Sequence, residues 1–291
     1  MQYAIEWVTA LKVKRMVNKT EAPYTALLPI KIVSFDDIVQ ASSSVIEGSA
    51  NRKYVYRKYV YRKYVKRLIE AHKLQAIRKG LYAVLSPLEK AEKYEPDKLL
   101  IASKIRKEYY LGFHTALEYY GCAYSVFNEA YVCVNSKDRF DPFRYKQFIF
   151  KPLFIKDTTS QVVEKPYGSS FLRVSSKERA FMECIDRVQY AGGWEECIKS
   201  LENLRGLDVE KLISLTLQQG KRGLPRRIGF ILDLLRKRSP FFEHINDTAL
   251  SKMEIEIRGS PQYLVRGKRG SLNRRWNLYI PEAFEEQLRG I

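Results

Sequence analysis

The sequence predicts an α+β protein with an N-terminal winged helix-turn-helix, a mixed α+β domain after it and a basic C-terminal segment. Three observations support this prediction: a basic, tyrosine-rich repeat with helical periodicity, a pair of short strand-like runs directly after it, and a mixture of strand-like and helix-like runs in the remaining chain. With 291 residues, of which 45% are hydrophobic and 13% aromatic, the chain can bury the cores of two domains.

The segment before the repeat is expected to contribute two helices. Residues 2–18 carry a rough apolar stripe with helical spacing, whereas two prolines indicate a connection over residues 20–29. A short helix over residues 33–38 is predicted to begin at Ser34, because serine is a good N-cap and two aspartates follow it.

The phrase RKYVY stands almost three times in a row over residues 52–67. Residues 51–79 contain eleven Lys and Arg against one acid, so this stretch carries +10 of the formal net charge of +18. A β-strand is one interpretation of the repeat, since YVYRKYVY has high β propensity. The other interpretation is a helix.

The helical wheel favours the helix. Leu68 shares one side of the wheel with Tyr54, Tyr61 and Tyr64, which are therefore predicted to pack in the core, and the basic residues gather on the opposite side. Arg57 falls among the apolar positions. The early part of the helix is therefore expected to project beyond its domain.

A hairpin is predicted directly after the basic helix. Residues 74–84 read as two short strands joined by Arg78, Lys79 and Gly80, and glycine supplies the backbone freedom that a tight turn requires. A helix, a basic helix and a hairpin in this order predict a winged helix-turn-helix domain over residues 1–86.

The rest of the chain is predicted to form an α+β domain over residues 97–239 and a mixed extension over 240–291. The boundary is placed in residues 87–97, which are charged and contain two prolines. Strand-like runs lie at residues 130–134, 147–155, 161–163 and 171–174, and helices are predicted at 99–120, 176–188, 193–203, 209–218, 226–237 and 280–288.

The charge of the chain points to a polyanion as partner, because phosphate neutralisation and counterion release supply most non-specific affinity for nucleic acids. A helix fits the major groove of double-stranded DNA, and a wing can reach the phosphates beside it. A solvated basic face without a partner is the alternative. The predicted DNA contacts are Arg52, Lys53, Tyr59, Arg62, Lys63, Lys66, Arg67, Arg78 and Lys79.

A second group of cations lies in the C-terminal extension. The stretch of residues 259–276 contains no acid and three glycines, so it reads either as a second DNA contact or as a flexible surface loop. The cations of this group are Arg266, Lys268, Arg269, Arg274 and Arg275.

No catalytic or metal-binding motif is present in the sequence. It has no GxxxxGK[ST] loop, no GxSxG elbow and no HExxH, and its three histidines are scattered. His114 is interpreted as a packed helix residue. The four cysteines form no CxxC pair and are interpreted as buried thiols. We therefore expect no enzyme activity, no metal and no cofactor.

The hydropathy pattern predicts a cytoplasmic protein with no membrane partner. No run approaches the roughly 18 apolar residues of a transmembrane helix. The N-terminal residues lack the order of charges of a secretory signal.

Four segments of the chain resemble the AbiEi family of antitoxins and transcriptional regulators. The likeness spans roughly residues 50–240 in order and spacing. The segments are RLIEAHKLQAIRKGLYAV (67–84), YYLGFHTALEYYG (109–121), VSSKERAFMECIDRVQYAGGWEE (174–196) and PRRIGFILDLL (225–235).

The resemblance implies a winged helix-turn-helix with a reading helix at residues 59–72 and a wing at 74–84, followed by an antitoxin domain at 99–237. It further implies a sequence-specific double-stranded DNA-binding repressor. Such a repressor would act as the autorepressing antitoxin of a type IV toxin–antitoxin pair in viral defence. The partner would be a nucleotidyltransferase-like toxin that the antitoxin need not contact directly.

Two features depart from the family pattern. The tandem RKYVY copies lengthen the reading helix, and the chain is more basic than an autorepressor requires. A general architectural DNA-binding protein with little sequence preference is therefore an alternative. A nucleic-acid enzyme or its accessory is a further one.

Overall fold

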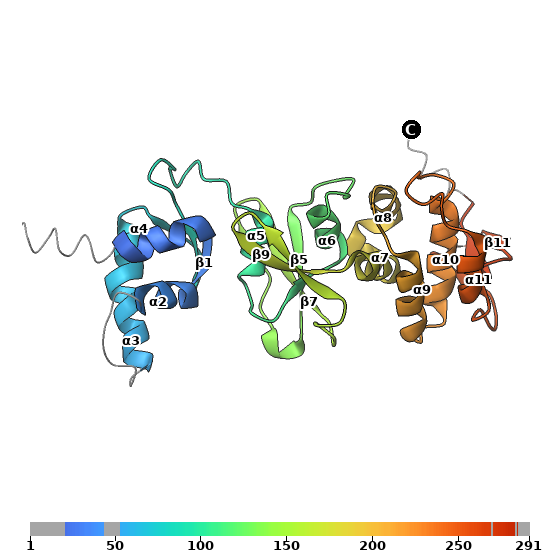
Figure 1. Ribbon diagram of the computed structural model, residues 1–291, viewed down its shortest axis with the longest axis horizontal. Coiled ribbons are helices and arrows are strands. Elements are labelled where there is room, and N and C mark those ends of the chain that lie inside the picture. The colour runs from blue at the N-terminus through green and yellow to red at the C-terminus, as the bar shows by residue number, and fades with distance from the viewer. Residues whose placement is uncertain (1–20, 44–52, 269, 283, 285–291) are drawn as a thin grey trace, which may run out of the picture. The chain divides into compact units, whose positions relative to one another are not determined.

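A computed structural model describes residues 21–43, 53–268, 270–282 and 284 (Figure 1). Helices and strands are mixed along the chain, which confirms the α+β class. The chain divides into two compact units. The N-terminal unit comprises the chain up to Lys107 together with residues 166–171, and the C-terminal unit comprises residues 108–165 and the chain from Leu172 onward.

The predicted domain limits differ from these units in two places. Helix α5 (Lys98–Ser103) clusters with the N-terminal unit, where Lys104 directly after it pairs with Asp37 at 3.2 Å. Residues 240–291, predicted as a separate extension, cluster with the C-terminal unit, in which Trp276 is fully buried.

The N-terminal unit has the element order of a winged helix-turn-helix. Residues 21–27 are helical, and the three-stranded antiparallel sheet has the order β1-β3-β2. Its elements are η1 (Leu28–Ile30), β1 (Ile32–Ser34), α2 (Phe35–Ser43), α3 (Lys53–Val60), η2 (Tyr61–Val65), α4 (Lys66–Glu70), β2 (Leu74–Arg78) and β3 (Leu81–Val84).

The first elements of this unit correct the sequence analysis. Most of the segment predicted as a connection is helical, because Tyr24 and Leu27 give it a buried side. Strand β1 replaces the start of the helix predicted over 33–38. Helix α2 then begins at Phe35, and Ser34 caps it: the Ser34 hydroxyl accepts from the Asp37 amide at 3.2 Å, and the Asp37 carboxylate accepts from the Ser34 amide at 2.8 Å. The helix predicted over 2–18 lies outside the described residues.

One apolar core joins the helices to the sheet of the N-terminal unit. The predicted hairpin is confirmed, with Gly80 at φ +80° in its turn and strand β2 paired to β3. The fully or nearly fully buried residues of this core are Tyr24, Leu27, Val33, Ile38, Val60, Tyr64, Val65, Leu68, Leu74, Tyr82 and Val84.

The C-terminal unit contains most of a six-stranded sheet of order β6-β7-β5-β4-β9-β8. Strands β5 and β7 run parallel over six residue pairs, so the sheet is mixed. Its strands are β4 (Tyr110–Leu111), β5 (Glu129–Val134), β6 (Phe143–Tyr145), β7 (Phe148–Phe154), β8 (Val162–Tyr167) and β9 (Ser170–Ser175).

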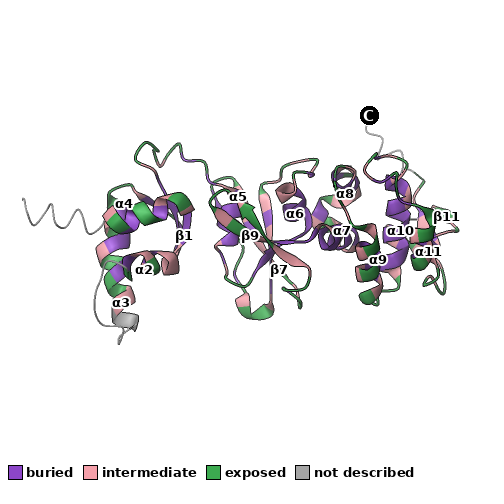
Figure 2. Cartoon of the chain, in the orientation of Figure 1, coloured by how far each residue is buried: buried purple, intermediate pink, exposed green. Residues whose placement is uncertain are grey.

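Helices follow and flank this sheet, and purple interior positions recur along them in Figure 2. The helices predicted over 176–188, 193–203, 209–218 and 226–237 are all present within a few residues. They and their neighbours are η3 (Ser136–Asp138), α6 (Phe113–Tyr119), α7 (Lys177–Asp186), η4 (Val188–Ala191), α8 (Gly193–Leu201), α9 (Val209–Gln218) and α10 (Gly223–Leu235).

The long helix predicted over 99–120 is wrong, because strand β4 divides it into α5 and α6. Gly112 sits at the break: a Cβ atom there would lie 2.8 Å from Glu183 Oε2 and 3.0 Å from Cys133 Sγ. Only glycine allows the backbone this close approach, and the next residue, Phe113, has φ +53°.

The last part of the chain forms helix α11 (Asp247–Glu254) and a small sheet of order β10-β12-β11, made by Gln262–Tyr263, Leu278–Ile280 and Ser271–Asn273. Trp276 anchors this part: it is fully buried, its indole N–H donates to Asp233 at 2.5 Å, and a Cβ on Gly229 would lie 2.0 Å from its ring. Of the helix predicted over 280–288, residue 280 belongs to β12 and residues 285–288 lie outside the described residues.

Candidate nucleic-acid interface

The helix formed by α3, η2 and α4 presents cations on the side opposite its core contacts. Its buried side holds Val60, Tyr64, Val65 and Leu68, which confirms the amphipathic helix and the packing of Tyr64. We call the opposite side the basic helix face. It consists of exposed Lys58, Tyr59, Arg62 and Lys66 and half-buried Lys63 and Arg67.

The cations of the basic helix face are largely without acidic neighbours. Lys66 lies 3.7 Å from Glu70, and because both side chains are more than 60% exposed this pair is weak. The other cations of the face have no carboxylate of the described residues within ion-pair distance. Their charge is therefore available to a partner.

A π turn in the middle of the helix sets which residues belong to this face. The amide of Lys66 donates to the carbonyl of Tyr61, an i→i+5 bond that accommodates about one more residue than an α-helical turn. Every residue before the turn is thereby rotated by about 100° relative to the wheel of a plain α-helix. Val60 moves to the core side, where it is fully buried.

The same rotation corrects the prediction for Tyr61. The α-helical wheel places Tyr61 on the core side, but it is 48% exposed and touches Phe35 edge-on, with ring centroids 6.4 Å apart. Tyr56 takes its place and packs against the core. The side chain of Tyr54 lies outside the described residues.

Arg57 anchors the early helix, which the sequence analysis expected to project beyond the domain. Its guanidinium donates to Asp36 at 2.6 Å and lies 4.8 Å from the centre of the Phe35 ring. This hydrogen bond from Arg57 lowers the pKa of the Asp36 carboxyl, which also pairs with Lys107 at 3.3 Å. Arg57 is thus engaged within the protein, and helix α3 is held to α2.

The remaining predicted DNA contacts of this unit differ in their solvent exposure, and some lie outside the described residues. Lys79 is exposed at the tip of the hairpin, whereas Arg78 is half-buried. Arg52 and the side chain of Lys53 lie outside the described residues. Lys58 is exposed on the basic helix face but absent from the predicted set, although its place in the repeat, equivalent to Lys63, was a signal for it.

The cations of the predicted second DNA contact in the C-terminal extension differ in their surroundings. Arg275 is engaged within the protein: its guanidinium pairs with Asp233 at 3.1 Å, with Asp247 at 2.9 Å and with Glu254. Exposed Arg266, Lys268 and Arg274 are not in this network, and Arg269 lies outside the described residues.

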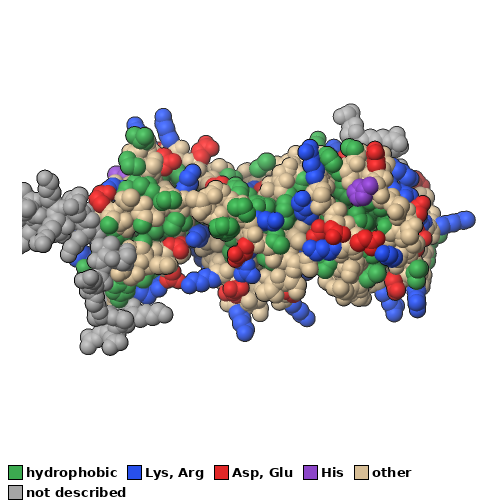
Figure 3. Space-filling model, viewed as in Figure 1, with side chains coloured by type: hydrophobic (Ala, Val, Ile, Leu, Met, Phe, Trp, Pro, Cys, Tyr) green, Lys and Arg blue, Asp and Glu red, His purple; other side chains and the backbone are tan. Residues whose placement is uncertain are grey.

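Such pairing is common in the C-terminal unit. On the face seen in Figure 3, basic and acidic side chains lie next to one another over much of this unit. Arg227 and Lys221 share Asp186, and Arg238 pairs with Glu202. The cations of this unit therefore contribute less accessible positive charge than their number suggests.

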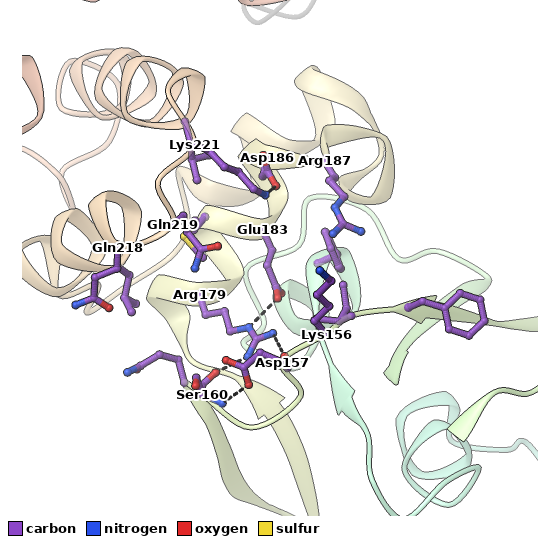
Figure 4. Close-up of a pocket in the computed structure, with 17 residues that line it drawn as sticks. Lys156, Asp157, Ser160, Arg179, Glu183, Asp186, Arg187, Gln218, Gln219 and Lys221 are labelled. Atoms are coloured by element: carbon purple, nitrogen blue, oxygen red, sulfur yellow. Dashed lines mark hydrogen bonds and ion pairs between the residues drawn. The ribbon is translucent and has the colours of Figure 1, made fainter. Parts of the chain in front are cut away.

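A polar cavity of about 590 Å³ lies in the C-terminal unit between β7, the following loop, and helices α7 and α9 (Figure 4). Arg179 lies at its wall and is almost fully buried. Its guanidinium donates to Glu183 at 2.8 Å, to the Tyr110 hydroxyl at 2.6 Å and to the carbonyls of Asp157 and Ser160. Burial raises the pKa of Glu183, against the effect of Arg179 beside it.

His114 is packed in the interior, as the sequence analysis interpreted it. It is 1% exposed, its ring stacks on Phe127 at 3.9 Å, and Nε2 lies 3.0 Å from Glu196. Burial opposes ionisation of Glu196, but hydrogen bonds from His114 and from the Ser125 amide hold its pKa below the ordinary value. This arrangement fixes α6 to α8.

Several further observations concern ligands and membranes. Within the described ranges, no cluster of three or more His, Cys, Asp or Glu side chains could hold a metal ion. All four cysteines are buried free thiols, as predicted. None of the helices that the structure describes combines the length and the apolar character needed to cross a bilayer.

Comparison with known proteins gives a likeness in fold. No family model and no curated protein matches the chain. Among solved structures, the chain is similar to the RV2827C protein from Mycobacterium tuberculosis. The two share 12% sequence identity with a TM-score of 0.56 over 94% of each chain. The likeness therefore shows a shared fold over nearly the whole length of both chains.

Proposed function

We propose that this protein is a double-stranded DNA-binding transcription regulator whose N-terminal unit binds the major groove through the basic helix face. One observation carries this proposal. The helix directly before the wing hairpin has a buried apolar side and an opposite side whose cations have almost no acidic partners among the described residues. In a winged helix-turn-helix this is the helix that enters the groove.

The residues of the face fit two kinds of contact. Arg62 and the neighbouring lysines are suited to phosphates and to the O6 and N7 acceptors of guanine. Exposed Tyr59 can donate a hydrogen bond to a phosphate or pack on the sugar. Lys79 at the wing tip would reach phosphates beside the groove, while Arg57, engaged with Asp36, positions the helix.

The regulatory role that we propose is autorepression as an antitoxin. This part rests on the resemblance to AbiEi proteins over residues 50–240. The gene beside it is then expected to encode a nucleotidyltransferase-like toxin. Co-expression with that gene tests the antitoxin role. Cells that express the neighbouring gene alone should stop growing, and co-expression of this chain should restore their growth. If the intact chain does not restore growth, the antitoxin role is rejected.

DNA binding is tested by fluorescence anisotropy with a labelled duplex from the upstream region of the gene and a composition-matched unrelated duplex, at several salt concentrations. A repressor should prefer the upstream duplex by about 10³-fold or more. Equal affinity for both duplexes with a steep salt dependence would replace the repressor by an architectural DNA-binding protein. Absence of binding to either duplex at low salt would reject both.

A further inference from the structure

The cavity beside Arg179 has a charge arrangement that the DNA-binding proposal does not use. Each acid at its wall already has partners: Glu183 holds Arg179, and Asp186 pairs with Lys221 at 2.5 Å. Asp157 accepts from the amides of the following turn, and the hydrogen bonds from Ser160 and its neighbour lower its pKa. Glu183 and Asp186 are thus engaged by cations, whereas Asp157 is held by neutral donors, and none of the three carboxylates forms an ion pair with Lys156 or Arg187 among the described residues.

Two cations at the cavity remain without such a partner. Lys156 and Arg187 have no carboxylate of the described residues within ion-pair distance, and Figure 4 shows their side chains pointing toward one another on the side away from Arg179. Arg187 also lies 5.8 Å from the centre of the Phe113 ring, which fixes its direction. Two like charges converging at one cavity repel one another unless an anion lies between them.

The walls that carry these cations are rigidly built. Arg179 ties the carbonyls of Asp157 and Ser160 to helix α7, so the loop after β7 cannot move freely. Two residues lining the cavity, Phe113 at φ +53° and Gln161 at φ +55°, have the left-handed backbone that non-glycine residues seldom adopt. Strained backbone held in place by its surroundings is a common feature of ligand sites.

The rest of the lining suits a ring-bearing molecule. Met182, Leu215 and Leu224 provide apolar surface, and the amides of Gln218 and Gln219 provide donors and acceptors. The volume of about 590 Å³ lies within the range of small-molecule sites.

We infer that this cavity binds a phosphorylated small molecule of nucleotide size, with Lys156 and Arg187 on the phosphates and the apolar wall against the ring. Planar, bidentate contact by arginine and point-charge contact by lysine are the usual means of holding phosphate oxygens. The site is independent of the basic helix face, which lies in the other unit.

Isothermal titration calorimetry of the full chain with ADP and with adenosine, without DNA or divalent metal, tests the inference. We expect ADP to bind at one site per chain and adenosine to bind at least about tenfold more weakly, since it lacks the charged groups. The variant Lys156→Glu with Arg187→Glu should weaken ADP binding by about tenfold or more, and Lys156→Gln with Arg187→Gln should give an intermediate affinity.

The matched control reverses two exposed cations of the same unit that lie away from the cavity, Lys137→Glu with Lys165→Glu, and it should bind ADP as the parent does. Circular dichroism melting verifies that all variants fold. Undetectable ADP binding by the parent would overturn the inference. So would equal ADP affinity in the cavity variant and the parent, or adenosine binding as tightly as ADP. Because no DNA is present, the DNA-binding proposal is tested separately.

Discussion

The repeat helix and the C-terminal extension are both rich in arginine and lysine, but their cations differ in how far they are paired with acids of the protein. Among the described cations of the repeat helix, Arg57 is held by Asp36 at 2.6 Å, whereas the cations of the basic helix face are exposed or half-buried and have at most the weak pair of Lys66 with Glu70. In the extension, Arg275 is surrounded by three carboxylates. The number of cations in a segment therefore does not measure its capacity to bind DNA. The capacity to bind DNA depends on how many of the cations are unpaired, because a cation that is already neutralised by an acid releases no counterions when it contacts a phosphate.

The largest effect is expected where a paired cation is removed from the interior. Arg179→Met should lower the stability of the C-terminal unit by about 3–5 kcal/mol, because it leaves the buried Glu183 carboxylate without its cation and the carbonyls of Asp157 and Ser160 without their donor. Thermal and urea unfolding would measure this. The exposed, unpaired Lys165→Met should leave the midpoint unchanged. Equal midpoints for both variants would mean that the Arg179 network does not hold the unit together.

Removing cations of the basic helix face, where the described residues offer only the weak pair of Lys66 with Glu70, should have the opposite consequence, with loss of binding and no loss of stability. Arg62→Ala with Lys66→Ala is expected to weaken binding to the upstream duplex by roughly thirtyfold or more. Both side chains are exposed and contribute little to packing. Anisotropy titration measures the affinity, with Lys137→Ala plus Lys165→Ala as the charge-matched control in the other unit. If the double variant binds as well as the parent, another surface contacts DNA.

Two adjacent arginines allow a direct test of the difference between a paired and an exposed cation. Arg275→Gln should cost about 1 kcal/mol or more, since it leaves Asp233, Asp247 and Glu254 without their common cation. Arg274→Gln, an exposed neighbour, should change stability by less than about 0.5 kcal/mol. Both substitutions remove one charge, so a difference in urea midpoint reports the contacts of Arg275, which are its ion pairs and its approach to the Trp276 ring at 5.2 Å. Identical midpoints would contradict the role given to the Arg275 network.

Sequence periodicity predicted the elements whose signals are local. The helix with its buried Tyr64, the hairpin with Gly80 in its turn, and the helices from α7 to α10 all follow from apolar spacing, caps and turn residues. These signals act within one element. They are therefore readable without knowledge of what the element packs against.

The features that the sequence did not predict depend on contacts between distant parts of the chain or on a departure from regular helix geometry. At the break, the backbone of Gly112 lies so close to Glu183, 71 residues later, that a Cβ would not fit. The pairing of Arg275 requires acids from two other helices. The π turn that exposes Tyr61 moves Val60 and Tyr56 to the core, and a wheel built at 100° per residue cannot express it.

The smallest predicted effect concerns Arg57, which has Asp36 as an acidic partner at 2.6 Å. Its hydrogen bond lowers the pKa of Asp36, so ionised Asp36 stabilises the folded N-terminal unit. A carboxyl with a lowered folded pKa contributes stability above its ordinary pKa of 3.8, and this contribution is lost as the pH falls below that value. Arg57→Gln should therefore cost a few tenths of a kcal/mol at pH 7 and nothing near pH 2, because Asp36 is about 45% exposed and solvent screens the pair.

Urea unfolding of parent and Arg57→Gln from pH 7 to pH 2 would measure this difference. Lys58→Gln removes the neighbouring charge of the same repeat copy and serves as the control, since Lys58 is exposed and should not alter the pH dependence. The two variants should differ in the reverse sense in DNA affinity: Lys58→Gln weakens binding and lowers its salt dependence by about one phosphate contact, whereas Arg57→Gln acts only through the position of helix α3. If Arg57→Gln lowers the salt dependence as much as Lys58→Gln does, Arg57 contacts DNA despite its ion pair, and pairing with Asp36 does not decide which cations of the repeat are available.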